Sequence, residues 1–266
     1  MYGAILGDIS GSPYEFDMGN KTKDFPLFSE HSTFTDDSVM TLAVAKAFME
    51  AGRDADDETV FRTLERVMHE VGLRHPHAGY GGMFSRWLFL EGYEPYNSYG
   101  NGSAMRVSSV AWLFDDIDAV RRAARLSASV THNHREGIRG AESVASAIFL
   151  ARTGHSKEEI KQYIEDEFEY IFVFTCDEIR PNYHHVETCQ ETVPEAMTAF
   201  MEGESFEDVI RTAVSLGGDC DTLTAIAGSM AEGFYGVPEN LKKKARSYLT
   251  PDLLEILDEF EAKTAV

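Results

Sequence analysis

The sequence predicts an all-α fold, and three observations support that prediction. Apolar residues recur every three or four positions in many segments, which is the spacing of a buried helical face. Helix-start signals precede several of these segments, including the Ser-Lys-Glu-Glu capping box at Ser156. Only residues 172–176 resemble a strand, and one strand cannot form a sheet. Because no change in composition marks a linker, we expect one domain over residues 1–266, a compact orthogonal multi-helix bundle.

The first segment has the pattern of a tightly packed helix. Residues 3–16 alternate small and large side chains, as a helix lying close to its neighbours does, and Pro13 interrupts the pattern. Glu15 is therefore expected near a helix end, where a solvated surface carboxylate is the usual role. Residues 19–33 are polar and rich in turn-forming residues, so they are expected to form a loop or flap.

The rest of the chain is read as helices joined by loops. Helices are expected over residues 39–51, 57–72, 118–131, 136–153, 156–170, 221–236 and 251–262, and from Val193 and Ser205 onward. Pro194 would then occupy an early helical position, which suits proline. Residues 75–82 and 177–189 are expected to be loops. The strand-like residues 172–176 are expected to form buried irregular chain.

Composition and charge exclude several classes of protein. Hydrophobic residues make up 43% of the 266 residues, yet no apolar run approaches the roughly 20 residues of a membrane span. A formal net charge of −21 repels nucleic-acid backbones and anionic membranes, so bulk nucleic-acid binding is not expected. The N-terminus lacks a basic segment typical of a secretory signal, so a cytoplasmic location is expected. Three cysteines without a CxxC spacing indicate neither a disulfide framework nor a zinc site.

Two clusters of carboxylates and hydroxyls stand at helix starts far apart in the sequence. The first is Thr35, Asp36 and Asp37, and the second is Asp219, Asp221 and Thr222. Each cluster taken singly is more typical of a helix cap, and Asp221 or Thr222 could cap a helix starting at Leu223. Together they favour a shared binuclear metal centre. Oxygen ligands without histidine or cysteine suit Mg²⁺ or Mn²⁺, with Ca²⁺ as an alternative, and disfavour zinc.

A glycine-rich turn precedes another helix start, expected near Ser103. The turn and its flanks are Ser98, Tyr99, Gly100, Asn101, Gly102 and Ser103. Glycines let backbone N–H groups approach phosphate oxygens, and a helix dipole favours negative charge, although a plain tight turn is the commoner reading of such a motif. His132 could contact a ligand, but an isolated histidine is more often capping or partly buried.

Five motifs in this order resemble the ADP-ribosylglycohydrolase family. They are Gly7-Asp8 with Tyr14-Glu15, Thr35-Asp36-Asp37, the stretch from Gly100 to Arg106, Thr131-His132, and the stretch from Ser215 to Thr222. The resemblance implies a two-metal enzyme, with two Mg²⁺ or alternatively Mn²⁺, that removes ADP-ribose from a modified protein side chain or a small conjugate. It implies metal ligation by the six residues of the two clusters, joined by Glu15 on a mobile flap. It places Glu15, Asp36 and Asp219 in catalysis.

By the same resemblance, residues 98–103 would bind the ADP-ribose phosphates, His132 would contact the ligand, and Arg106 would support the turn. The chemistry suits these residues, because cleavage at the anomeric carbon develops oxocarbenium character that positioned carboxylates and ions stabilise. Some relatives carry an aspartate shortly before the turn, whereas residues 93–99 contain none; Glu94 is the possible substitute, more typical of a solvated residue. A catalytically silent ADP-ribose-binding module is the alternative, and the acceptor linkage stays open.

Overall fold

A computed structural model describes residues 1–16, 21–90 and 94–264. Its regular elements are α1 (Tyr2–Gly11), η1 (Ser12–Tyr14), α2 (Asp36–Ala51), α3 (Asp57–Arg74), α4 (Gly82–Phe89), α5 (Gly102–Met105), α6 (Val110–Leu113), α7 (Ile117–Ser129), α8 (Arg135–Arg152), α9 (Lys157–Phe168), α10 (Cys176–Ile179), α11 (Cys189–Glu202), α12 (Phe206–Leu216), α13 (Cys220–Tyr235), α14 (Glu239–Arg246) and α15 (Pro251–Thr264). No strand occurs within these ranges, which confirms the all-α prediction. Within the same ranges, no helix is both long and apolar enough to cross a bilayer.

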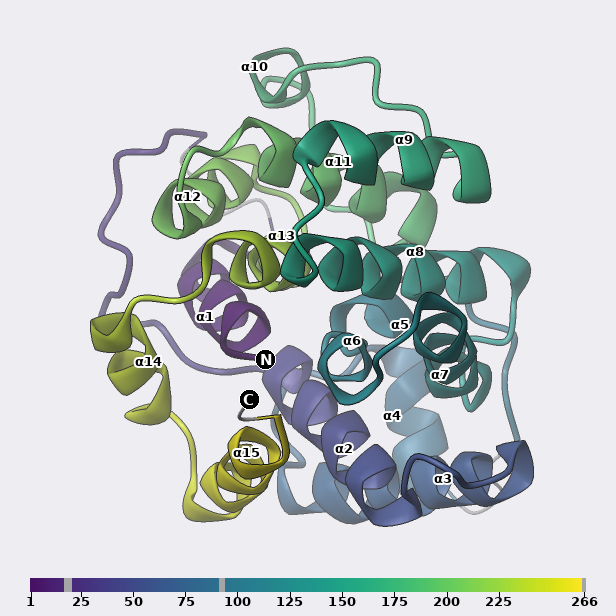
Figure 1. The fold of residues 1–266 in the computed structure, drawn as a ribbon. Helices are drawn as coiled ribbons and strands as arrows, with labels where there is room; N and C mark the ends of the chain where they lie inside the picture. Colours follow the sequence, from purple (N-terminus) through teal and green to yellow (C-terminus); the bar gives the residue numbers. More distant parts are fainter. Residues whose placement is uncertain (17–20, 91–93, 265–266) are drawn as a thin grey trace.

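Helix α13 lies at the centre of the bundle. Figure 1 shows it beside α1, with α11 and α12 on one side and α2 and α3 on the other. Every residue from Cys220 to Ala231 is buried, including the polar ones. The helix therefore forms much of the core, and its N-terminal end carries the second acidic cluster.

The close packing predicted for the first helix is present between α1 and α13. Gly3 and Gly7 of α1 lie directly against the backbone of α13, since an added Cβ would lie 2.0 Å from Gly228 O and 2.2 Å from Thr224 O respectively. The two backbones touch because neither glycine has a side chain to hold them apart. This contact places Asp8, the residue after Gly7, close to the start of α13.

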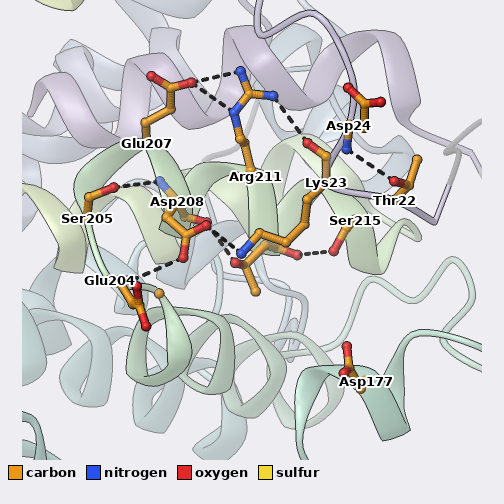
Figure 2. Close-up of polar contacts among 12 residues, drawn as sticks. Thr22, Lys23, Asp24, Asp177, Glu204, Ser205, Glu207, Asp208, Arg211 and Ser215 are labelled. Carbon is orange, nitrogen blue, oxygen red and sulfur yellow. Dashed lines mark hydrogen bonds and ion pairs between the residues drawn. The ribbon is translucent and has the colours of Figure 1, made fainter.

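The loop between Glu15 and Thr35 is anchored to α12. Figure 2 shows Lys23 paired with Asp208 and Arg211 bonded to the Lys23 carbonyl and to Glu207. Arg211 also donates to the Phe25 carbonyl at 2.7 Å and lies over the buried Phe25 ring. The described part of the predicted loop, residues 21–33, contains no helix, as expected, while residues 19–20 lie outside the described residues. Residues 23–25 are thus fixed to the helix that leads into the second acidic cluster.

Two predictions about helix boundaries are wrong. Helix α11 begins at Cys189, four residues before the expected start at Val193, so Pro194 lies inside the helix. The earlier start buries Cys189 and Thr192. Pro194 has no N–H to donate to the carbonyl of Gln190, and because Gln190 is exposed, that carbonyl can bond water instead. Helix α13 begins at Cys220, with Asp219 as its N-cap residue, and not at Leu223.

The predicted burial of residues 172–176 is also wrong for most of the segment. Ile171, Val173 and Phe174 are 74%, 70% and 63% exposed, although the segment is irregular as expected. Tyr170 and Cys176 are buried and hold the ends of the connection between α9 and α10, and between them only Phe172 is half-buried against the core. The short helices α4, α6, α10 and α14 lie in stretches for which no helix was predicted, because one or two turns give little periodic signal.

Candidate active site

The two acidic clusters and the glycine turn meet at one cavity of about 690 Å³. The predicted site residues that line it are Glu15, Asp36, Asp37, Ser98, Asn101, Gly102, His132, Asp219, Asp221 and Thr222. The cavity lies where the N-terminal ends of α2, α5 and α13 converge. Its size is within the usual range for a small-molecule site.

The first cluster is held in place by Asp8. The Asp8 carboxylate accepts hydrogen bonds from Thr35 N at 2.9 Å, Thr35 Oγ1 at 2.8 Å and Ser38 N at 3.1 Å, and another from the Ser38 hydroxyl. Thr35 is the N-cap of α2, and its hydroxyl accepts from Asp37 N. Asp8 therefore fixes the first turn of α2 from the neighbouring helix α1. Asp8 belongs to one of the sequence motifs. As a single carboxylate in an apolar, glycine-rich helix, however, it did not indicate that it would hold the first turn of α2.

The second cluster is aimed at the first by a glycine pair. Gly217 and Gly218 have φ values of 72° and 75°, which favour glycine, and a Cβ on Gly218 would lie 2.7 Å from His184 O. The turn ends at Asp219, whose Oδ2 accepts from Asn101 Nδ2 at 2.6 Å. Asn101, predicted to bind substrate, thus also orients a carboxylate.

Hydroxyl groups connect the two clusters across the cavity wall. Thr222 Oγ1 donates to Asp37 Oδ2 at 3.1 Å, and Thr35 Oγ1 lies 3.4 Å from Asp221 Oδ2. The structure therefore brings together the six cluster residues that the sequence places at two distant helix starts. Glu15, the C-cap residue of η1, joins them, because one ligand atom each from Glu15, Asp219 and Asp221 lie within 4.8 Å of one another.

Crowded carboxylates give the cavity an unusual electrostatic character. Burial, followed by the charges of Asp221 and Asp8, raises the pKa of Glu15 to about 8. Burial and the charge of Asp221 raise the pKa of Asp8 to about 7, and burial followed by the same neighbour raises the pKa of Asp37 well above its usual value. So many like charges in a poorly solvated space favour either protonation or bound cations.

The donor set fits hard divalent cations. All of its members offer carboxylate or hydroxyl oxygens, which Mg²⁺ and Mn²⁺ prefer. Asp37 Oδ1 is buried and has no hydrogen-bond partner among the described residues, so one carboxylate oxygen is left for a ligand other than a protein donor.

The glycine turn forms a further part of the cavity wall, together with a segment that precedes α11. Asn101 N donates to Glu187 O at 2.8 Å, and Gly100 pairs with Thr188 in an isolated antiparallel bridge. A Cβ on Gly102 would lie 3.1 Å from His132 Nε2, so the histidine faces the turn closely. Helix α5 is only one turn long, so it supplies little of the dipole on which the phosphate-binding argument relied.

The remaining predicted residues lie beside the cavity without lining it. Ser103 donates to Gly137 O at 2.7 Å, and Gly100 accepts from the Cys189 thiol, so both support the turn. Tyr99 is 49% exposed and packs edge-on against His134. Glu94 is exposed and does not line the cavity, whereas Tyr93 lies outside the described residues.

Several lining residues were not predicted from the sequence. Phe16, Arg86, His185 and Glu187 contribute to the cavity. Phe16 lies 5.1 Å from the His185 ring, and His185 Nε2 lies 3.1 Å from Glu187 Oε1. These residues come from stretches without a motif, and only their position after folding identifies them.

Comparisons with known proteins point in one direction. The sequence model of the family described as ADP-ribosylglycohydrolase matches residues 1–265. The protein named ADP-ribosylhydrolase ARH3 of Homo sapiens is 28% identical, over 95% of this chain and 89% of its own length. ADP-ribosylarginine hydrolase Tri1 of Pseudomonas putida strain GB-1 is 26% identical, over 93% of this chain and 73% of its own. A solved structure titled ADP-ribosylglycohydrolase-related protein complex shares the fold, with a TM-score of 0.69, 23% identity, and coverage of 98% of this chain and 93% of that one.

Proposed function

The chain belongs to the ADP-ribosylglycohydrolase family of enzymes, and from that premise we propose that it cleaves the glycosidic bond between ADP-ribose and a modified acceptor. The acceptor is a protein side chain or the remainder of a small ADP-ribose conjugate. The observation that carries the proposal is the convergence of Glu15, Asp219 and Asp221 oxygens in a cavity that the glycine turn and His132 also line. One pocket would then contain both the carboxylates that act on the reacting sugar and the turn that binds the phosphates.

Seven residues of this chain would hold two divalent cations, Mg²⁺ or Mn²⁺. They are Glu15, Thr35, Asp36, Asp37, Asp219, Asp221 and Thr222. When bound, such cations neutralise the crowded carboxylates and polarise oxygen atoms of the substrate. The unpartnered Asp37 Oδ1 and the raised pKa values of the neighbouring carboxyls support this assignment.

The protein groups would prepare the reaction before the bond breaks. Glu15 would orient a water molecule toward the anomeric carbon and accept its proton, which suits a carboxylate that lines the cavity beside Asp219 and Asp221 and is ionised when the cations are bound. Asp36 and Asp219 would hold the reacting ribose in register through the cation site. Asp8 and Asn101 keep the two clusters fixed by hydrogen bonds, so little reorganisation is needed as charge develops on the sugar.

Ligand binding would use the glycine turn. Backbone N–H groups within residues 98–103 that do not already bond the protein itself, as those of Gly100 and Asn101 do, would donate hydrogen bonds to the phosphates. His132, which also lines the cavity, would contact the same ligand. Close approach there depends on glycine, because any Cβ at Gly102 would meet the histidine.

A turnover panel tests the proposal. The enzyme would be incubated with peptides ADP-ribosylated on arginine or serine, with ADP-ribosylated nucleic-acid ends and with O-acetyl-ADP-ribose, each with Mg²⁺ or EDTA. We expect release of free ADP-ribose from at least one class, and only with metal. A silent binding module would instead bind ADP-ribose with Mg²⁺ and release none from any conjugate.

A further inference from the structure

Three buried side chains form a hydrogen-bonded chain in the cavity wall. Arg106 donates from Nη2 to Thr131 Oγ1 at 2.8 Å and to Ser127 O at 2.7 Å. Thr131 Oγ1 in turn lies 2.7 Å from His132 Nδ1. All three residues are buried, and His132 lies against the cavity with Nε2 near the glycine turn.

Chemistry fixes the direction of the hydrogen bond from Arg106, and the tautomer of His132 decides the direction of the other. A guanidinium can only donate, so Thr131 Oγ1 must accept from Arg106. Its single hydrogen then remains for another acceptor. The His132 ring nitrogen can be that acceptor only when Nδ1 is unprotonated. Tyr96, which also faces Thr131, stays a neutral phenol with its own proton to donate, because burial raises its pKa to about 12.

The charge state of His132 agrees with this arrangement. Burial, followed by the nearby positive charge of Arg106, lowers the pKa of His132 well below its usual value. The ring is then neutral, and a neutral ring with a free Nδ1 carries its proton on Nε2. Among the described residues Arg106 forms no ion pair, and its guanidinium donates to neutral oxygens of Ser127 and Thr131.

We propose that Arg106 and Thr131 are positioning residues that fix His132 as a neutral Nε2–H donor aimed at an oxygen acceptor of the ligand beside the glycine turn. Thr131 does not line the cavity, and Arg106, which does, acts on His132 through Thr131 in this arrangement. Thr131 sets the tautomer, and Arg106 sets the direction of the Thr131 hydroxyl. The identity of the ligand oxygen as one of ADP-ribose rests on the proposed function, whereas the tautomer does not.

Nitrogen-15 NMR of the histidine rings tests the tautomer directly, with His132→Gln used to assign the His132 signals. We expect the wild-type ring to show the Nε2–H neutral pattern with metal bound. Thr131→Val, which replaces the hydroxyl by a methyl of similar volume, should abolish that preference, and Thr131→Ser should restore it. A wild-type ring that is protonated on Nδ1, or on both nitrogens, overturns the proposal whether or not ADP-ribose binds.

Calorimetry with ADP-ribose and Mg²⁺ tests the consequence. Thr131→Val should bind ADP-ribose about tenfold or more weakly than wild type, because it loses one hydrogen bond to a charged oxygen. Thr131→Ser should recover the wild-type affinity. The matched control is Thr198→Val, which removes a buried hydroxyl that bonds Pro194 O in α11, far along the chain from these residues. Equal affinity of Thr131→Val and Thr198→Val overturns the proposal. If the wild-type protein does not bind ADP-ribose, the proposed function fails, and the NMR result alone decides the tautomer.

Discussion

Replacing Gly7 by alanine perturbs the fold and the candidate site through one contact. The added methyl would lie 2.2 Å from Thr224 O and 2.4 Å from Thr224 C, both backbone atoms of α13. Ordinary contacts between such atoms begin near ~3.5 Å, and no side-chain rotation can move a backbone away. The two helices must therefore separate by about 1 Å or tilt to remove the overlap.

The expected cost lies at the upper end for overpacking. Extra methyl groups in packed cores cost about 1–3 kcal/mol, and here both sides of the contact are main chain, so we expect a loss of about 3 kcal/mol in the free energy of unfolding. For a chain of this length that corresponds to a fall of about 6–12 °C in Tm. Because Asp8 follows Gly7 and holds Thr35, the displacement also moves the first acidic cluster away from Asp221, so Mg²⁺ should bind more weakly.

Urea unfolding followed by circular dichroism measures the first effect, and calorimetric titration with Mg²⁺ measures the second. Gly81→Ala is the control for stability, because a Cβ there meets no atom within 4 Å and the backbone has a φ of −56°. Its free energy of unfolding should stay within about 0.5 kcal/mol of wild type. A Gly7→Ala protein as stable as Gly81→Ala would refute the argument that α1 and α13 pack backbone to backbone.

Four further outcomes are expected. EDTA should abolish turnover, and Asp219→Asn should do so without loss of helical circular dichroism; full turnover after metal stripping would contradict the cation site. Glu15→Gln should reduce the rate at saturating substrate and Mg²⁺ about 100-fold or more while ADP-ribose affinity changes little, and a near-wild-type rate removes Glu15 from catalysis. Gly102→Val should reduce thermal stabilisation by ADP-ribose, because its side chain meets His132, and an unchanged shift would argue against ligand binding at the turn. Asp8→Asn should destabilise the fold by about 2 kcal/mol and weaken Mg²⁺ binding, measured by unfolding and titration, since an amide nitrogen in place of Oδ2 cannot accept from the backbone N–H and hydroxyl of Ser38; wild-type values for both would show that Asp8 does not hold the cluster.

Local sequence determined most of the helices. Their signals act within one or two turns: the apolar spacing of α3, the Ser156 capping box of α9 and the glycine spacing of α1 are each contained in a short stretch. Where the local signal was short or ambiguous, the prediction was wrong. Pro194 indicated a helix start, yet burial of Cys189 extends α11 past it, and the apolar residues 171–174 lie on the surface because they only connect two buried ends.

The sequence also indicated the family, which the family match confirms, and it supplied the residues proposed for the site. Tertiary structure decided how those members meet. The contact between Thr35 and Asp221 joins residues 186 positions apart, and the bond from Asn101 to Asp219 joins residues 118 positions apart. Asp8 and Thr131 gained their roles only when α1 met α2 and when Arg106 was buried beside His132. Motifs show which chemical groups are present, but hydrogen-bond direction, burial and charge crowding depend on distances in space, and those distances are set by the packing of helices that are remote in the chain.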